Sequence, residues 1–167
     1  MHEALISIKP TYVRKFLAGE KSVEVRNRTV NLSPGSRLWI YSTLPKGCVE
    51  AVAEVHRVVV GTPSEIWHRY SDCLAVSRTT YLEYVNGASA ISAIVTKAIW
   101  SLPVEMNLSM LRSGVPRFHP PQFLKYMADS DPVFMTIVRF LYASANEEYL
   151  QKIGLTKKCS GLANASR

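Results

Sequence analysis

A chain of 167 residues with 47% apolar and 20% charged residues has enough material for one folded domain with its own core. This composition excludes an intrinsically disordered chain, a collagen-like repeat and a disulfide-rich scaffold. No apolar run reaches the roughly 18 residues that a transmembrane helix needs, and the first residues show no signal-peptide pattern. We therefore predict a protein that resides in the cytoplasm and does not enter a membrane.

The first part of the chain is predicted to alternate strands with one short helix. Residues 4–8 read as a strand, and Pro10 then begins a helix for which Gly19 is a candidate C-cap. Strand-forming residues follow over 21–28 and 37–43. A long strand with a bulge is predicted over 48–60.

The second part of the chain changes to a helical period before the last strand. Helices are predicted from Pro63, where Thr62 is the N-cap, and over 79–85. A strand over 90–100 is expected to end by Pro103. A helical turn over 108–112 and a proline-rich loop over 116–121 come next. A terminal helix begins at Pro132, runs to 153 and carries an apolar stripe, and a mobile tail follows.

Positive charge is concentrated near the start of the chain. The formal net charge is +7, and residues 9–46 hold eight basic but two acidic residues. A local excess of this kind favours an anionic partner such as a nucleic acid, because fixed cations attract phosphate and release its counterions. A solvated surface with a basic isoelectric point remains the alternative.

Metal and redox chemistry have no support in the sequence. Its three cysteines and four histidines do not follow a metal-ligand spacing. An odd number of cysteines without a paired motif also does not indicate a disulfide framework. We therefore expect no metal ion and no cofactor.

The predicted strand over 21–28 carries the candidate chemistry. Its period of two places Val23 and Val25 on one face, and Glu24 and Arg26 on the other. Lys21 has the opposite parity and reaches the same site if the preceding turn redirects it. An ordinary surface ion pair is the alternative interpretation of Glu24 and Arg26.

The segment 19–26, GEKSVEVR, resembles the GxKxxExR motif of the ASCH superfamily, which follows a first strand and helix. Segments 35–43 and 118–122 are similar to that family's next strand and to its proline-containing loop. Trp67, Tyr84 and Gly87 fall where the helical insertion of the family often has such residues. The resemblance implies an α+β fold: a small PUA-like mixed β-barrel with peripheral helices and an added C-terminal helix. The implied division is a barrel domain at 1–128, a helix packed on it at 129–153 and a flexible tail at 154–167.

The resemblance also implies a nucleic-acid-binding module that recognises RNA or a modified nucleotide in a basic cleft. Phosphate contacts, base contacts and aromatic stacking are the proposed roles. The candidate binding residues are Lys9, Tyr12, Lys21, Glu24, Arg26, Arg28, Ser42, Thr43, Lys46 and Phe118.

Two other functions stay open at this point. Some relatives are hydrolases, either metal-independent ribonucleases or N4-acetylcytidine amidohydrolases, and Lys21 and Glu24 would then be catalytic. The amidohydrolases have a hydroxyl three residues after the lysine, where this chain has Glu24, and the question of catalysis is left open. Alternatively, the terminal helix serves a protein partner or a homodimer through its apolar stripe, Val133, Phe134, Ile137, Val138 and Leu141.

Overall fold

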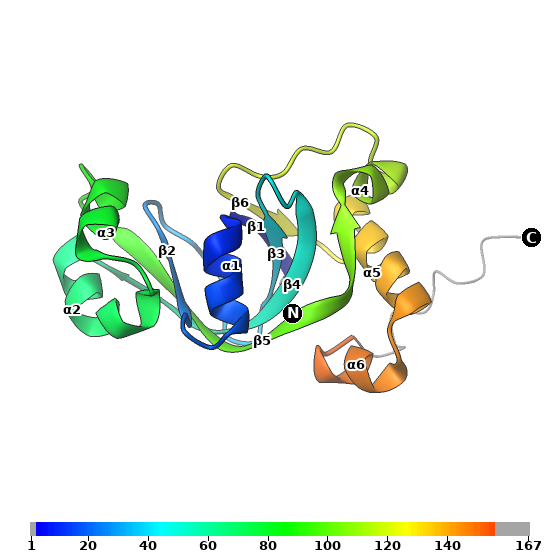
Figure 1. Cartoon of the computed structure of the whole chain (residues 1–167), viewed down its shortest axis with the longest axis horizontal. Helices are drawn as coiled ribbons and strands as arrows, with labels where there is room; N and C mark the ends of the chain where they lie inside the picture. Colours follow the sequence, from blue (N-terminus) through cyan, green and yellow to red (C-terminus); the bar gives the residue numbers. More distant parts are fainter. Residues whose placement is uncertain (1–2, 156–167) are drawn as a thin grey trace, which may run out of the picture.

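The computed structural model describes residues 3–155 and combines a mixed sheet with peripheral helices (Figure 1). The strands are β1 (Glu3–Ile8), β2 (Val23–Arg26), β3 (Arg37–Ser42), β4 (Cys48–Gly61), β5 (Ile91–Asn107) and β6 (Leu124–Met127). The helices are α1 (Pro10–Leu17), α2 (Pro63–Leu74), α3 (Arg78–Val85), α4 (Leu108–Gly114), α5 (Pro132–Ser144) and α6 (Glu147–Lys152).

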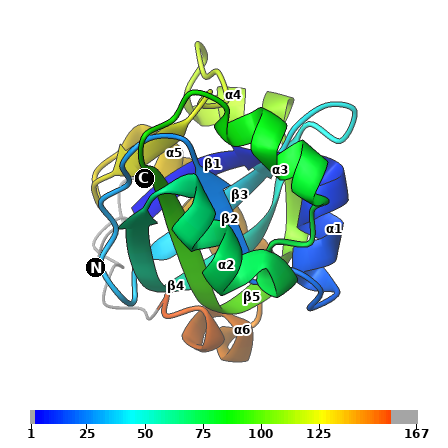
Figure 2. The same ribbon diagram turned by 90° about the vertical axis from the view of Figure 1, so that its left-hand side faces the viewer.

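The sheet has the strand order β2-β5-β4-β3-β1-β6. The β1–β3 pair is parallel, and the other pairs are antiparallel. The sheet curls into a half-barrel, so that β2 comes back towards β1 although the two strands are far apart in the strand order (Figure 2). This α+β architecture confirms the predicted fold class. The short strand β6 was not predicted.

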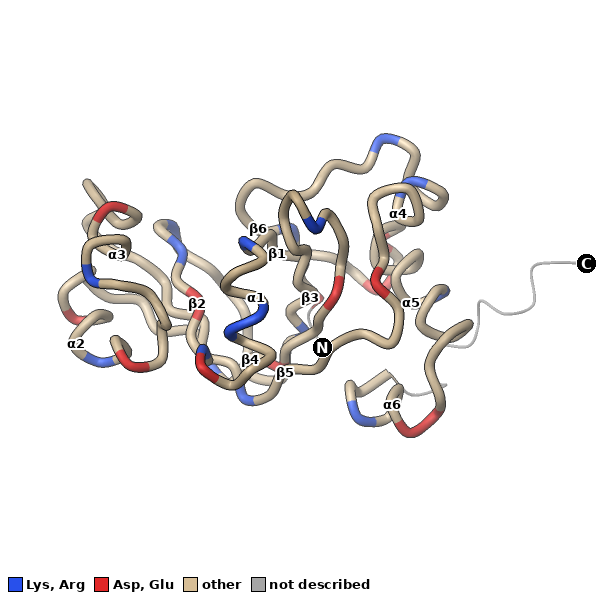
Figure 3. The backbone as a smooth tube through the Cα atoms, in the orientation of Figure 1, with Lys and Arg blue, Asp and Glu red and all other residues tan. Residues whose placement is uncertain are grey.

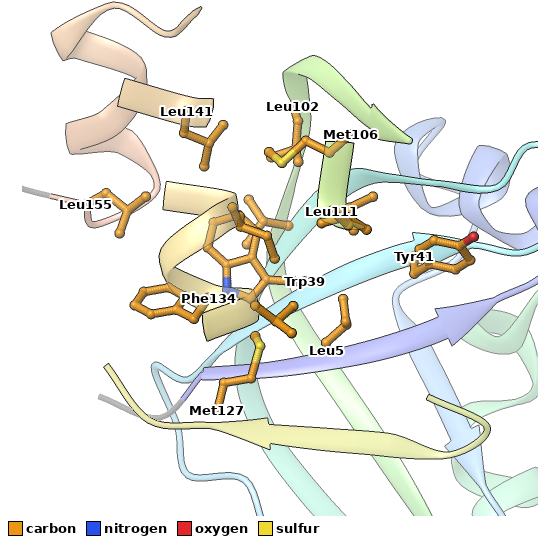
Figure 4. Close-up of a cluster of buried hydrophobic side chains, with 14 of the residues drawn as sticks. Leu5, Trp39, Tyr41, Leu102, Met106, Leu111, Met127, Phe134, Leu141 and Leu155 are labelled. Atoms are coloured by element: carbon orange, nitrogen blue, oxygen red, sulfur yellow. The ribbon is translucent and has the colours of Figure 1, made fainter. Parts of the chain in front are cut away.

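Apolar side chains fill both faces of the curled sheet. On one face Ile6, Ile8 and Ile40 pack with Val13 and Phe16 of α1. On the other face Trp39 packs against Phe134 of α5, with ring centroids 6.2 Å apart, in the cluster shown in Figure 4. A third cluster joins β2 to helices α2 and α3. Each face of the sheet therefore has a helical cover, which is how a mixed sheet of this size buries its apolar surface.

The long strand β5 passes through Pro103 instead of ending before it. Ala51 pairs with Ser101, whereas Val49 pairs with Met106, so several residues of β5 oppose Glu50 alone. A proline lacks the backbone N–H that a regular ladder needs, and a bulge removes that need. The prediction that Pro103 terminates the strand was therefore wrong.

The predicted terminal helix is broken into two. Helix α5 ends at Ser144, and Asn146 caps α6 by accepting a hydrogen bond from the backbone N–H of Tyr149. The cap competes with continuation of the first helix. The apolar stripe of α5 packs on the protein's own sheet, and Ile137 and Leu141 are fully buried there. Residues 156–167, most of the predicted tail, lie outside the described residues.

No helix within residues 3–155 is long and apolar enough to cross a membrane.

Candidate functional site

Strand β2 presents two faces of opposite character, as its sequence predicts. Val23 and Val25 are buried against α2 and α3. Glu24 and Arg26 point to the other side, where the Arg26 Nη2 atom lies 3.1 Å from Glu24 Oε1. Their side chains are 12% and 9% exposed, respectively. The pair is therefore too buried to be an ordinary surface ion pair.

The turn before β2 brings Lys21 to the same site. The strand begins only at Val23, and the Lys21 Nζ atom lies 3.3 Å from Glu24 Oε2. Lys21 also donates hydrogen bonds to the carbonyl oxygens of Val23, at 2.6 Å, and Leu74, at 3.0 Å. An ammonium group has three N–H donors. These three acceptors therefore match its full donor capacity.

Burial disfavours the positive charge of Lys21, whereas a neighbouring carboxylate and two aromatic rings favour it. Burial lowers the pKa of Lys21, while the Glu24 carboxylate acts in the opposite direction. The Lys21 Nζ atom also lies 5.1 Å from the ring centroid of Phe16 and 5.6 Å from that of Tyr12. Both distances are within the range in which a cation is attracted to an aromatic face. The half-buried ring of Tyr12 therefore lies against the Lys21 side of the Lys21–Glu24–Arg26 cluster.

The C-terminal end of helix α2 supplies acceptors for two lysines. Lys21 bonds to the carbonyl of Leu74, and Lys15 bonds to that of Ala75 at 2.6 Å. Ala75 has a left-handed backbone, with φ of 53°, which ends the helix and leaves these carbonyls without helical partners. Cations are favourable at this end because of the helix dipole. This bonding joins α1, α2 and the start of β2.

Arg26 connects β2 to β1 across the open side of the half-barrel. Its Nη2 atom donates to the carbonyl oxygen of Ser7 at 2.8 Å. The carbonyl of the next residue, Ile8, accepts a hydrogen bond from the backbone N–H of Thr43, just beyond β3. Carbonyl groups alternate in direction along a strand, so the Ser7 carbonyl points away from β3. We call this junction of Arg26 and Ser7 the seam.

The guanidinium at the seam is incompletely bonded. Arg26 is 7% exposed, and its Nε atom has no hydrogen-bond partner among residues 3–155. The hydroxyl of Ser42, which is buried at the end of β3, also lacks one within the same residues. Unpartnered buried donors are unusual in native structures, and a functional role is one accepted reason for them.

The structure does not gather all predicted residues at the seam. Thr43 lies next to the end of β1, where its backbone N–H donates to Ile8. Lys46 is directed elsewhere, to Glu105 at 2.6 Å, and this hydrogen bond raises the pKa of Lys46. Phe118 is 4% exposed and belongs to the core cluster around Trp39.

Two further predicted residues, Lys9 and Arg28, are exposed. Lys9 lies at the N-cap of α1. The Arg28 guanidinium carbon lies 5.9 Å from the ring centroid of Phe123. Neither position joins the Lys21–Glu24–Arg26 cluster directly, but both are free to meet a charged ligand in solution.

Sequence reasoning missed Tyr84 as a site residue. This side chain of α3 is 44% exposed and lies close enough to Arg26 and Glu24 to be influenced by their charges. Burial raises the pKa of Tyr84. Tyr81 and Val85 are the residues of α3 that are buried against β2. Further large apolar or aromatic residues on so short a helix are more than this packing needs, and that excess in the sequence could have drawn attention to Tyr84.

Among residues 3–155 there is no group of three or more histidine, cysteine, aspartate or glutamate side chains that could hold a metal ion.

The chain is similar to proteins that carry an ASCH domain. It is 30% identical over 126 residues to a protein of Zymomonas mobilis named an ASCH domain-containing ribonuclease, covering 75% of this chain and 84% of that protein. The crystal structure of ASCH from Zymomonas mobilis matches 82% of this chain and 94% of its own, with a TM-score of 0.75 and 28% identity.

Two further matches agree with this result. A serine-to-alanine variant of the Zymomonas mobilis protein matches 83% of this chain and 95% of its own, with a TM-score of 0.76 and 28% identity. The family model for a domain of unknown function, DUF365, matches residues 5–111. The chain therefore belongs to the DUF365 family and is an ASCH domain protein, as the motif in β2 predicted.

Proposed function

We propose that this protein binds single-stranded RNA and that the Glu24–Arg26 pair at the seam is a contact point for it. The observation that carries the proposal is the Arg26 guanidinium, which is buried and charged but has an unpartnered Nε atom. Guanidinium groups of this kind recognise phosphates and base acceptors through paired N–H donors. The name of the relative, a ribonuclease, supports RNA as the partner.

Each member of the cluster has a distinct role in this proposal. Arg26 donates to an acceptor on the RNA, and Glu24 orients the guanidinium and accepts from a base amino group. Lys21 does not contact the ligand, because its donors are already used by Glu24 and two carbonyl oxygens. It is a positioning residue that holds the carboxylate of Glu24 in place.

The surface around the seam adds electrostatic attraction. Figure 3 shows basic segments at the start of α1, in the loop after β2, in the β3–β4 turn and after α4, along the upper side in that view. Lys9 and Arg28 belong to the first two of these segments and are exposed. Phosphates bound there release counterions, so the affinity should fall steeply with salt.

Fluorescence anisotropy with a labelled single-stranded RNA, over a salt series, tests this proposal. We expect salt-sensitive binding by the parent protein and at least about a tenfold loss for Arg26→Gln, since a charge-assisted hydrogen bond contributes about 1.5–3 kcal/mol. The matched control is Arg139→Gln, which removes an exposed arginine from α5 at the other end of the molecule (Figure 1). Equal losses in the two variants, or no binding by the parent protein, would refute the proposal.

The second candidate function is cleavage of the bound RNA, which the name of the relative favours. In this reaction Glu24 removes the proton of a ribose 2′-hydroxyl, whose oxygen attacks the adjacent phosphorus. The bond from phosphorus to the 5′-oxygen breaks, and this oxygen takes up a proton from water. Arg26 stabilises the extra negative charge on the phosphoryl oxygens in the transition state. The products are a 2′,3′-cyclic phosphate and a 5′-hydroxyl end.

Glu24→Gln separates binding from cleavage. The amide keeps the size of the side chain but cannot act as a base, so we expect RNA binding to remain and product formation to stop. Mass spectrometry of the RNA ends, with magnesium and with a chelator, measures the second quantity. Equal cleavage rates for the parent and the variant would remove Glu24 from the mechanism.

A further inference from the structure

Tyr126, on the edge strand β6, is a large aromatic residue that the fold leaves half in solvent. It is 50% exposed, whereas the next residue, Met127, is buried in the cluster around Trp39. Successive residues of a strand point to opposite faces of the sheet, so Tyr126 lies on the face away from that cluster. The packing of β6 therefore leaves aromatic surface of Tyr126 open to another molecule.

A hydrogen bond fixes the far end of the Tyr126 ring. Its hydroxyl oxygen accepts from the backbone N–H of Asn31, in the loop after β2, at 2.8 Å. Immobilising a free side chain is one of the costs of binding, and a ring that is already held avoids part of this cost. An aromatic ring that is anchored at one end and exposed over its surface is a suitable platform for another flat group.

A second contact joins the same two segments of the chain next to the seam. The guanidinium carbon of Arg28 lies 5.9 Å from the ring centroid of Phe123. The register of β6 on β1 puts Phe123 at the level of Ser7, the residue whose carbonyl accepts from Arg26. The exposed Arg28 and the ring of Tyr126 therefore belong to a surface that continues from the seam.

The charge of this surface indicates the class of its partner. Its two segments, residues 27–36 and 116–128, contain arginine and lysine but no aspartate or glutamate. Exposed cations and exposed aromatic rings together are typical of surfaces for single-stranded nucleic acids, where cations follow the phosphates and rings stack on bases. A duplex keeps its bases stacked on one another and could use only the cations. These features favour a single strand with unpaired bases.

We propose that Tyr126 is a stacking platform for an unpaired base of an RNA strand that also contacts the seam. This inference rests on the proposed RNA-binding function and deepens it, because it adds a base subsite outside the seam. Arg28, on the same loop as Asn31, binds a phosphate of the same strand. Stacking uses the flat face that every base has, so the subsite accepts any of the four bases.

Fluorescence anisotropy with a labelled single-stranded RNA tests this proposal. Tyr126→Leu removes the ring and should weaken binding by about 5-fold to 150-fold, the loss expected for one base–aromatic stack. Tyr126→Phe keeps the ring and should remain within about threefold of the parent protein, because the hydroxyl group bonds to the protein and one neutral hydrogen bond contributes little net energy.

The matched control is Tyr149→Leu. This partly exposed tyrosine of α6 also bonds to a backbone group, the carbonyl of Ser101 at 2.7 Å, but lies away from the upper side of the molecule in Figure 1. We expect the control to bind RNA like the parent protein. An equal loss of affinity in Tyr149→Leu and Tyr126→Leu would overturn the proposal.

A second probe identifies the part of the RNA that Tyr126 contacts. The same oligonucleotide with all bases replaced by abasic ribose units keeps the phosphates but cannot stack. We expect Tyr126→Leu to bind this abasic strand as the parent does, whereas Arg28→Gln should weaken the binding of both strands. An equal loss of affinity for the two strands in Tyr126→Leu would refute the stacking role, since Tyr126 would then act on the backbone or on the fold.

The two proposals can fail separately. If the parent protein binds RNA and Arg26→Gln does not, but Tyr126→Leu binds like the parent, the stacking inference is wrong and the RNA-binding site stands. If the parent protein does not bind the RNA, the proposed function itself fails. Circular dichroism checks that each variant is folded, and Tyr126→Thr, a strand-forming residue without a ring, takes the place of Tyr126→Leu if the leucine variant does not fold.

Discussion

Residues 3–155 contain two largely buried pairs of glutamate and arginine that differ in how completely they are bonded. Glu3 on β1 accepts hydrogen bonds from Arg37 and from the indole N–H of Trp39 at 2.8 Å. Arg37 also donates to the carbonyl of Gly154 at 2.6 Å. In the other pair, Glu24 and Arg26, the Arg26 Nε atom has no partner among residues 3–155.

This difference separates a structural pair from a candidate site. A buried ion pair is tolerated when further hydrogen bonds satisfy the remaining donors and acceptors. The Glu3–Arg37 pair meets this condition and connects β1 and β3 to the end of the described chain. The Glu24–Arg26 pair leaves the buried Arg26 Nε donor without a partner among residues 3–155, and unpartnered buried donors of this kind are unusual in a purely structural pair.

The largest effect should come from breaking the structural pair. Glu3→Gln leaves the charge of Arg37 buried without its carboxylate, and such a loss typically costs about 3–5 kcal/mol of unfolding free energy. Denaturant unfolding followed by circular dichroism measures this cost. RNA affinity of the folded protein should stay within about twofold, a difference of about 0.4 kcal/mol. A stability loss well below that range would show that this pair is not a structural clamp.

A smaller loss of stability and a larger loss of binding should follow from Arg26→Gln. The Ser7 carbonyl loses its charged donor, which costs about 1–3 kcal/mol, but Glu24 keeps Lys21 as a partner at 3.3 Å. Arg26→Gln should therefore lower RNA affinity more than stability, whereas Glu3→Gln should lower stability and leave RNA affinity almost unchanged. Arg26→Lys, which keeps the charge but lacks the planar fork, serves as the control and should restore only part of the affinity.

A third prediction concerns the charge of Lys21. Its pKa is lowered by burial, so the folded protein binds this proton less tightly than the unfolded chain does. The cost of the buried charge is therefore complete at neutral pH and disappears as the pH rises from the folded pKa to the ordinary value of 10.5. The unfolding free energy of the parent protein, relative to Lys21→Met, should rise over that interval. A constant difference would contradict a lowered pKa.

The smallest effects are expected at the exposed basic residues. Lys9→Ala should reduce the slope of log affinity against log salt by about 0.7, the contribution of one phosphate contact on a single strand. Lys46→Ala should change it less, because Lys46 is already paired with Glu105 at 2.6 Å. Anisotropy titrations at four or more salt concentrations measure both slopes. An equal reduction would show that the pairing does not persist in the complex.

The fold was predictable from the sequence where local patterns agree with tertiary packing. The alternation in β2 separated Val23 and Val25 from Glu24 and Arg26, and the structure confirms both faces. The patterns failed where long-range pairing decides the outcome. Pro103 lies in a strand because a bulge opposite Glu50 removes the need for its N–H, and no local pattern contains that information.

The candidate site was predictable only in part, for a related reason. The motif located Lys21, Glu24 and Arg26, and the structure joins their side chains. Residue type alone could not show that Phe118 is in the core. Nor could it show that Tyr84 of a separate helix lies close enough to Arg26 for the two groups to interact electrostatically, because that proximity depends on how α3 is placed beside β2.

The most direct test of the central claim is to follow the arginine Nε–Hε signals by NMR during titration with a single-stranded RNA. Variants Arg26→Lys and Arg37→Lys assign the two signals, and Arg37 is the internal control because its Nε atom already bonds to Glu3 at 3.1 Å. We predict that the Arg26 signal moves as RNA binds, while the Arg37 signal stays in place. An unmoved Arg26 signal at saturating RNA, or equal movement of both signals, would contradict the assignment of the seam as the binding site.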